Sequence, residues 1–221
     1  MLWSKIIGAG GAGGVVEGWN VSAAVFNQSL SVAAQDSAPS GVFFKPDGLK
    51  MYVIGRVVGN VNEYNLSTAW DISTAVFNQS LSVSAQESVP TDVFFKPDGL
   101  KMYVIGENDI NVDEYDLSTS WDVSTAVFLQ RFSVAAQEAI PQGLFFKPDG
   151  LKMYVIGRVE DNVNEYNLST SWDISTAVFL QSFSVAAQEA NPQGLFFKPD
   201  GLKMYVIGSI SDNVNEYDLT A

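Results

Sequence analysis

The segment FKPDGLKMYVIG at residues 44–55 recurs unchanged at residues 95–106, 146–157 and 197–208. Each copy follows the last by 51 residues, and Trp70, Trp121 and Trp172 keep the same spacing. A repeat of about this length is typical of solenoids, propellers and arrays. The sequence therefore predicts one unit written four times, at residues 19–69, 70–120, 121–171 and 172–221, after a glycine-rich arm at residues 1–18.

Each unit has the pattern of four β-strands. In the third copy, residues 126–134 alternate between apolar and polar, and residues 163–168 give a further strand. Residues 143–147 and 152–156 are apolar runs on either side of Pro148-Asp149-Gly150, where Pro presets φ and Gly accepts a positive φ. No segment has capped helical periodicity. Four antiparallel strands in about 50 residues indicate a β-propeller blade.

A resemblance supports this fold. The run PQGLFFKPDGLKMYVIG at residues 141–157, followed by NVNEYNLST at residues 162–170, resembles the blades of Tyr-Val-Thr-Asn and related lactonase-like propellers. It is also similar to repeats in phage and marine bacterial proteins. The resemblance covers residues 19–221 and implies the propeller fold. It leaves function open, because propellers host binding, scaffolding and catalysis alike.

The order of the strands predicts how the ring closes. Residues 24–32 form a lone outer strand at the start, and the last unit stops after its third strand. We expect an all-β propeller of four-stranded antiparallel blades, four blade equivalents per chain, closed by a shared N- and C-terminal blade that leaves no exposed sheet edge. One chain can close this ring alone, or two chains can exchange strands to form an eight-bladed homodimer. The resemblance favours the homodimer, since similar blades occur more often in rings of six to eight.

Composition excludes several kinds of chemistry. The chain has no Cys and no His, which removes zinc ligands of these types and the Ser-His-Asp and Cys-His mechanisms. Its net charge of −13 opposes binding to nucleic acid or anionic lipid. No stretch approaches the roughly 20 apolar residues of a membrane span, and no signal peptide is recognised. We expect neither nucleic-acid binding nor membrane insertion.

Two sets of segments vary between the copies, the loop after each YVIG and the link before each inner strand. Both are expected on one face, which makes that face a candidate binding surface, although neutral drift in exposed loops explains the same variation. The candidate binding residues are Val57, Val58, Glu107, Asp109, Val159, Glu160, Ile210 and Asp212.

Four acidic residues form a ring on the same predicted face. Asp36, Glu87, Glu138 and Glu189 could hold a hard cation such as calcium through oxygen ligands. No spacing matches a complete calcium-binding loop, so solvated acidic loops are the favoured explanation. We expect no cofactor and treat these residues only as weak metal candidates.

The leading functional hypothesis is a non-catalytic binding or structural propeller. It would be a phage particle component or a surface adhesin, anchored by its N-terminal arm on a virion or extracellular surface and bound to a protein partner or a host surface ligand. Near-identical units supply rings of equal groups rather than the asymmetric set that an active site needs, so we expect no enzyme. The alternatives are a metal-dependent lactonase-like hydrolase, in which a cation would activate water, and an intracellular protein-interaction scaffold.

Overall fold

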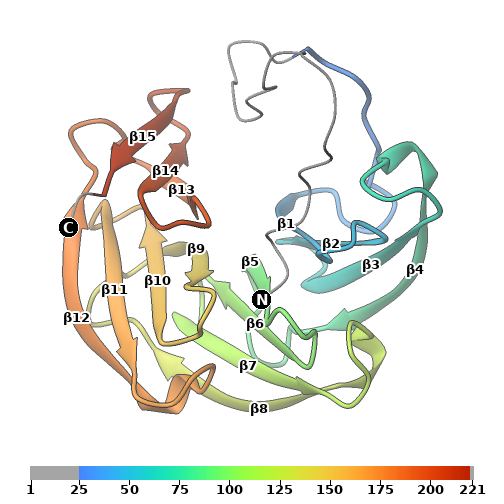
Figure 1. Cartoon of the computed structure of the whole chain (residues 1–221), viewed down its shortest axis with the longest axis horizontal. Coiled ribbons are helices and arrows are strands. Elements are labelled where there is room, and N and C mark those ends of the chain that lie inside the picture. The colour runs from blue at the N-terminus through green and yellow to red at the C-terminus, as the bar shows by residue number, and fades with distance from the viewer. Residues whose placement is uncertain (1–24, 220–221) are drawn as a thin grey trace, which may run out of the picture.

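The computed structural model describes residues 25–219, which form four antiparallel sheets arranged around a centre as propeller blades (Figure 1). This confirms the predicted all-β propeller of four blade equivalents. The first blade contains β1 (Pro39–Phe44), β2 (Lys50–Gly55), β3 (Asn60–Leu66) and β4 (Ala75–Ser82). The second contains β5 (Pro90–Phe95), β6 (Lys101–Gly106), β7 (Asn111–Leu117) and β8 (Ala126–Ser133). The third contains β9 (Pro141–Phe146), β10 (Lys152–Gly157), β11 (Asn162–Leu168) and β12 (Ala177–Ser184), and the fourth contains β13 (Pro192–Phe197), β14 (Lys203–Gly208) and β15 (Val214–Asp218).

The PDG turn sets the register of the inner hairpin in every blade. In the first blade, Gly48 has φ 72°, and its amide donates to the carbonyl of Lys45 at 2.8 Å. The Asp47 carboxylate accepts from the amide of Leu49 at 3.0 Å. A positive φ suits glycine because it has no Cβ to clash with the backbone. The turn therefore places Phe44 opposite Met51 and aligns the two innermost strands.

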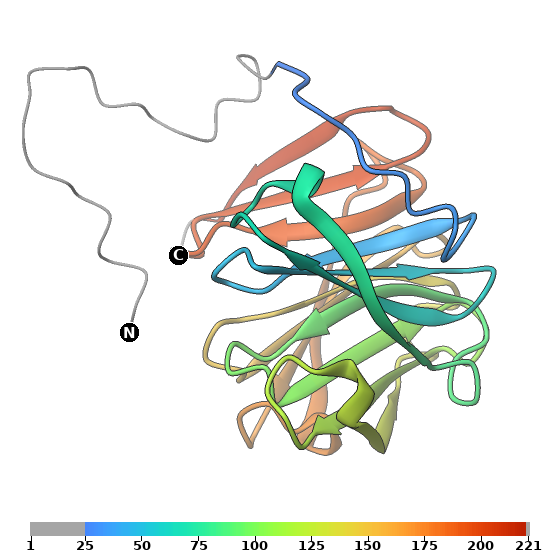
Figure 2. The same ribbon diagram turned by 90° about the vertical axis from the view of Figure 1, so that its right-hand side faces the viewer.

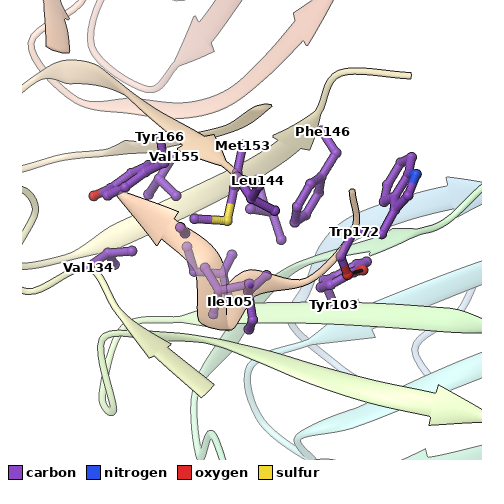
Figure 3. Close-up of a cluster of buried hydrophobic side chains, with 13 residues drawn as sticks. Tyr103, Ile105, Val134, Leu144, Phe146, Met153, Val155, Tyr166 and Trp172 are labelled. Atoms are coloured by element: carbon purple, nitrogen blue, oxygen red, sulfur yellow. Dashed lines mark hydrogen bonds between the residues drawn. The ribbon is translucent and has the colours of Figure 1, made fainter. Parts of the chain in front are cut away.

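The blades are joined by aromatic junctions that repeat. The hydroxyl of Tyr52 donates to the carbonyl of Trp121 at 2.7 Å, and the hydroxyl of Tyr103 donates to that of Trp172 at 2.6 Å. Figure 3 shows Tyr103 and Ile105 of the second blade against Phe146 and Trp172 of the third. Fully burying one such large apolar side chain stabilises a fold by about 1.5–3 kcal/mol, so these junctions hold the arc together.

Three short 3₁₀ helices, Ile72–Thr74, Val123–Thr125 and Ile174–Thr176, follow the tryptophans. The sequence analysis did not predict them. An aspartate caps each one; Asp122, for example, accepts from the amide of Ser124 at 3.0 Å. Such a cap stabilises a single helical turn without the apolar periodicity that reveals longer helices.

The arc is open between the first and fourth blades (Figure 1). The fourth sheet has three strands, and residues 25–32 have no strand structure. The predicted closing blade, in which N- and C-terminal strands share one sheet, is therefore not formed within residues 25–219 and stays a prediction. Figure 2 shows the segment that begins at residue 25 (blue) running down beside the first blade. The predicted arm at residues 1–18 lies outside the described residues. In residues 25–219 no helix is long and apolar enough to cross a membrane.

Candidate functional site

The innermost strands β1, β5, β9 and β13 surround the centre of the arc (Figure 1). They bound a cavity of about 340 Å³ that reaches from the first blade to the fourth. Its polar lining includes Ser40, Asp92, Gln142 and Gln193, one residue from each inner strand. A concave space with a few convergent polar groups is the usual form of a small-molecule site.

Asp92 is the acidic group in the lining of this cavity. One carboxylate oxygen accepts from the amide of Val93 at 2.8 Å, and the other accepts from the amide of Leu144 on β9 at 3.0 Å. Burial raises the pKa of Asp92 from 3.8 to about 7, although the two amide hydrogen bonds oppose this change. A carboxyl group with such a pKa can exchange a proton near neutral pH.

Gln142, which lines the same cavity as Asp92, hydrogen-bonds to a charged cluster. The Gln142 amide nitrogen donates to Glu107 at 3.1 Å, and its carbonyl oxygen accepts from Arg56 at 2.6 Å. Arg56 also forms an ion pair with one oxygen of Glu107, while Arg158 forms one with the other oxygen at 2.9 Å. The two guanidinium groups contribute two positive charges, and the carboxylate that they share contributes one negative charge. The cluster is therefore locally positive in a chain whose net charge is −13.

The four copies differ at residues that form this site, so the site is asymmetric. Asp92 stands where the other copies have Gly41, Gly143 and Gly194. Glu107 occupies the repeat position that is Arg56 and Arg158 in its neighbours. The expectation that four matched units leave only rings of equal groups is wrong here, because substitutions between copies place a single carboxyl group in the cavity lining and a single glutamate between two arginines.

The sequence-predicted binding residues lie in the loops between the second and third strands of each blade. Val57, Val58, Val159 and Ile210 are exposed apolar side chains in these loops. Among the acidic candidates, Glu107 joins the charged cluster, Glu160 accepts from the amide of Ala139 at 3.0 Å, and the Asp109 amide donates to Glu87. Asp212 has φ 53° at the turn before β15. Recognition by this face stays a prediction.

The four weak metal candidates each lie within their own blade, where they hold two loop segments together. Glu87 accepts from the amides of Val89 at 2.7 Å and Asp109 at 3.0 Å. Asp36, Glu138 and Glu189 accept from backbone amides in the same way. Across residues 25–219, no three or more acidic side chains gather into a group that could hold a metal ion.

The sequence analysis did not single out Asp92, Gln142, Arg56 or Arg158 as site residues. Asp92 could have been found as the acidic exception among three glycines in otherwise matched inner strands. The variation among Arg56, Glu107 and Arg158 was visible as loop variation. The contact between these three side chains was not visible in the sequence, because it depends on the rotation between successive blades.

Comparisons with known proteins support the fold. No protein-family model matches the chain, and no curated protein matches it. The chain is similar to the solved structure of a putative 6-phosphogluconolactonase from Bacteroides uniformis, with TM-score 0.60 and 16% identity over 88% of this chain and 55% of that one. A putative 6-phosphogluconolactonase from Bacteroides fragilis gives TM-score 0.59 and 16% identity over 81% and 50%. The periplasmic gluconolactonase of Pseudomonas aeruginosa gives 0.52 and 17% over 82% and 53%.

These comparisons contradict the leading functional hypothesis. Three of the similar structures are named as lactonases, which favours the hydrolase alternative over a non-catalytic phage component or adhesin and contradicts the expectation that the chain is no enzyme. At 16–17% identity the likeness itself shows the fold alone. The chain also spans about half the length of these structures. The similarity establishes the propeller architecture of the chain.

Proposed function

We propose that the central channel hydrolyses the lactone of a sugar acid, with Asp92 as the general base. The observation that carries this proposal is a carboxyl group able to exchange protons at neutral pH in the lining of a cavity that it shares with Gln142, which hydrogen-bonds to a locally positive cluster. The names of the similar structures and the resemblance of the repeats to lactonase-like propellers support the same reaction.

Lactone hydrolysis needs few groups, and the channel offers them. A water molecule attacks the ring carbonyl carbon while Asp92 takes its proton. The carbon–oxygen bond of the ring then breaks, and Asp92 returns the proton to the departing ring oxygen. The product is a hydroxy acid, and the carboxyl group ends in its starting state. Proton transfer of this kind contributes about 100-fold to 10,000-fold to a rate.

The arginine cluster suits an anionic substrate or product. Arg56 and Arg158 are two of the three arginines in the chain, and both lie against Glu107. Guanidinium groups bind carboxylate and phosphate through paired hydrogen bonds, and only part of each guanidinium is used by Glu107. The cluster would hold the acid group of the product or a phosphate on the sugar.

The proposal is tested by following hydrolysis of glucono-δ-lactone, with and without a 6-phosphate, against the uncatalysed rate. We expect Asp92→Asn to lower kcat/KM by about 100-fold or more. Arg158→Gln should raise KM for the phosphorylated lactone by about 10-fold, as the loss of one charge-assisted contact predicts.

Asp113→Asn is the matched control, because burial raises the pKa of Asp113 to about 7 as well, but this residue is on β7, outside the cavity lining. Its kcat/KM should equal that of the unchanged chain. Full activity in Asp92→Asn would remove Asp92 from the reaction. A rate no higher than the uncatalysed one for the unchanged chain would reject the proposed function.

A further inference from the structure

The fourth blade exposes an apolar face that the other blades bury. Ile207 is 50% exposed, whereas Ile54, Ile105 and Ile156 at the same repeat position are fully buried. Val214 is likewise exposed, although its counterparts in the first three blades are buried. The face that each earlier blade packs against the next one has no neighbour here among residues 25–219.

The first blade exposes the complementary face. Trp70 is 55% exposed, while Trp121 and Trp172 are each 6% exposed within the junctions. Val42 is also exposed, although its counterparts Val93 and Leu144 are buried. The two open faces are therefore the two halves of a junction that the chain already forms three times.

A cavity at the edge of the fourth blade lacks its usual occupant. In the first three blades, a Cβ atom on Gly48, Gly99 or Gly150 would lie within 2.4 Å of a tryptophan ring. A Cβ atom added to Gly201 would have no atom of the described residues within 4 Å, apart from its chain neighbours. A cavity of about 230 Å³ opens beside Gly201, between the third and fourth blades, with Phe145 and Phe197 in its lining.

One segment of this chain has the sequence of the missing piece. Residues 19–32 read WNVSAAVFNQSLSV, and residues 70–83, which supply the tryptophan, the 3₁₀ helix and the outer strand of the first blade, read WDISTAVFNQSLSV. By sequence, the segment at residues 19–32 therefore matches the vacant tryptophan, link and outer-strand positions of a fourth blade.

The described part of this segment already makes half of the junction contacts. Gln28 donates to Asp71 at 2.7 Å, as Gln79 donates to Asp122 at 2.6 Å between the first and second blades. Gln79 also donates to Glu63 of its own blade at 3.0 Å. The corresponding glutamate of the fourth blade is Glu216, whose side chain is 50% exposed. Gln28 thus contacts Asp71 of the first blade, while Glu216, the equivalent of the second partner of Gln79, makes no contact with it among the described residues.

We propose that a second copy of this chain fills the gap, and that two copies form one ring of eight blades. In each junction, residues 19–32 of one chain would complete the fourth blade of the other. The ring has two-fold symmetry, and both of its joints repeat the internal blade junction. Exposed sheet edges and apolar faces favour such pairing.

Closure within one chain is disfavoured by the geometry of the junctions. The three internal junctions use the same kinds of contact, and the arc that they build remains open (Figure 1). A fourth junction inside one chain would require all of them to change.

The repeat register specifies which residues would meet. Because Asn60 pairs with Ser82 and Asn111 with Ser133, Asn213 of one chain would lie opposite Ser31 of the other. Both residues are exposed in the single chain, and the chain has no cysteine of its own. A disulfide engineered between these positions therefore reports the proposed pairing without background.

The test combines solution mass with this cross-link. Light scattering should give twice the chain mass of 24.0 kDa. Oxidised Ser31→Cys/Asn213→Cys should migrate as a covalent dimer that thiol reduces, whereas Ser82→Cys/Asn213→Cys should not cross-link, because Ser82 already pairs with Asn60. Ile207→Asp should reduce the mass to that of one chain, while Val178→Asp on the exposed side of β12 should not.

A single-chain mass together with no cross-link would overturn the proposal. So would a cross-link that forms only within one chain, since that result would show a closed four-bladed ring. A mass larger than two chains would indicate open head-to-tail assembly and would overturn the eight-bladed ring as well. Val42, Ile207 and Val214 also line the central cavity, but mass and cross-linking are measured without lactone hydrolysis, so the two proposals can fail separately.

Discussion

Oδ2 of Asp92 on β5 lies 3.0 Å from the backbone nitrogen of Leu144 on β9 and so links the inner strands of the second and third blades. The glycines at this position in the other copies have no side chain to make this contact. The link places an ionisable group at a blade junction, where its protonation affects stability as well as chemistry.

Stability should therefore depend on Asp92 between about pH 4 and pH 7. Burial raises the pKa of Asp92 to about 7, so the folded chain keeps a proton that the unfolded chain releases near pH 4. Because the folded state binds more protons across this range, the contribution of Asp92 to stability falls as the pH rises through it. Asp92→Asn should lose this dependence and gain stability relative to the unchanged chain at pH 8.

Thermal unfolding of both proteins at pH 4 and pH 8 checks this expectation. The melting temperature of Asp92→Asn minus that of the unchanged chain should be larger at pH 8 than at pH 4. An equal difference at both values would show that Asp92 titrates normally in the folded chain.

Asp113 should be a second source of instability at high pH. It is fully buried on β7, and its carboxylate oxygens make no hydrogen bond within residues 25–219, although Arg131 lies 3.3 Å away. The other copies have an asparagine here. Asp113→Asn should raise the free energy of unfolding at pH 8 by about 1–2 kcal/mol, since burying a carboxylate without hydrogen bonds costs more than its ion pair with the half-exposed Arg131 returns.

Asp116→Asn provides the comparison for Asp113→Asn. Asp116 is also an asparagine in two other copies, but it is exposed and ion-paired to Lys101 at 2.7 Å. Its replacement should change stability by at most about 1 kcal/mol, the usual limit for an exposed ion pair. Denaturant unfolding at pH 8 measures both variants. A larger gain from Asp116→Asn than from Asp113→Asn would contradict the assigned burial.

Much of the fold could be predicted because its signals are local. The Pro148-Asp149-Gly150 turn and the apolar runs beside it predicted strands at residues 143–147 and 152–156, and the structure has β9 and β10 there. Trp121 and Trp172 are buried, as large aromatic side chains usually are, but the equivalent Trp70 is not. Trp70 is exposed because burial at a junction requires a preceding blade, and that depends on how the ring closes.

The candidate site could be predicted much less. Glu107 was selected because its loop varies, but its contacts with Arg56 and Arg158 join residues one repeat apart. Such contacts follow from the rotation between blades, which no local pattern encodes. The acidic residues Asp36, Glu87, Glu138 and Glu189 recur at one position of the repeat. That they accept hydrogen bonds from backbone amides is visible only once the loops are placed in space.

Glu87 should matter for the order of the loops. Its carboxylate accepts from the amides of Val89 and Asp109 and is fully buried. Glu87→Ala leaves both amides without this partner and should cost about 1–3 kcal/mol. Hydrogen exchange should accelerate at these two amides. Unchanged exchange, or a shift in melting temperature on adding calcium that the Ala variant loses, would favour metal binding over this structural role.

Tyr103 should contribute to stability through its hydroxyl group. The hydroxyl donates to the carbonyl of Trp172 at 2.6 Å inside the junction between the second and third blades, and both side chains are buried. Tyr103→Phe keeps the ring packing but leaves a buried carbonyl without its donor, so it should lower the free energy of unfolding by about 1–2 kcal/mol. Tyr217→Phe is the control, because its hydroxyl makes a longer contact with Gln188, at 3.4 Å, near the open edge. That change should cost less than about 0.5 kcal/mol, because the contact of the Tyr217 hydroxyl is exposed to solvent. Urea unfolding compares the two variants, and equal losses would mean that the hydrogen bond to Trp172 adds nothing to the junction.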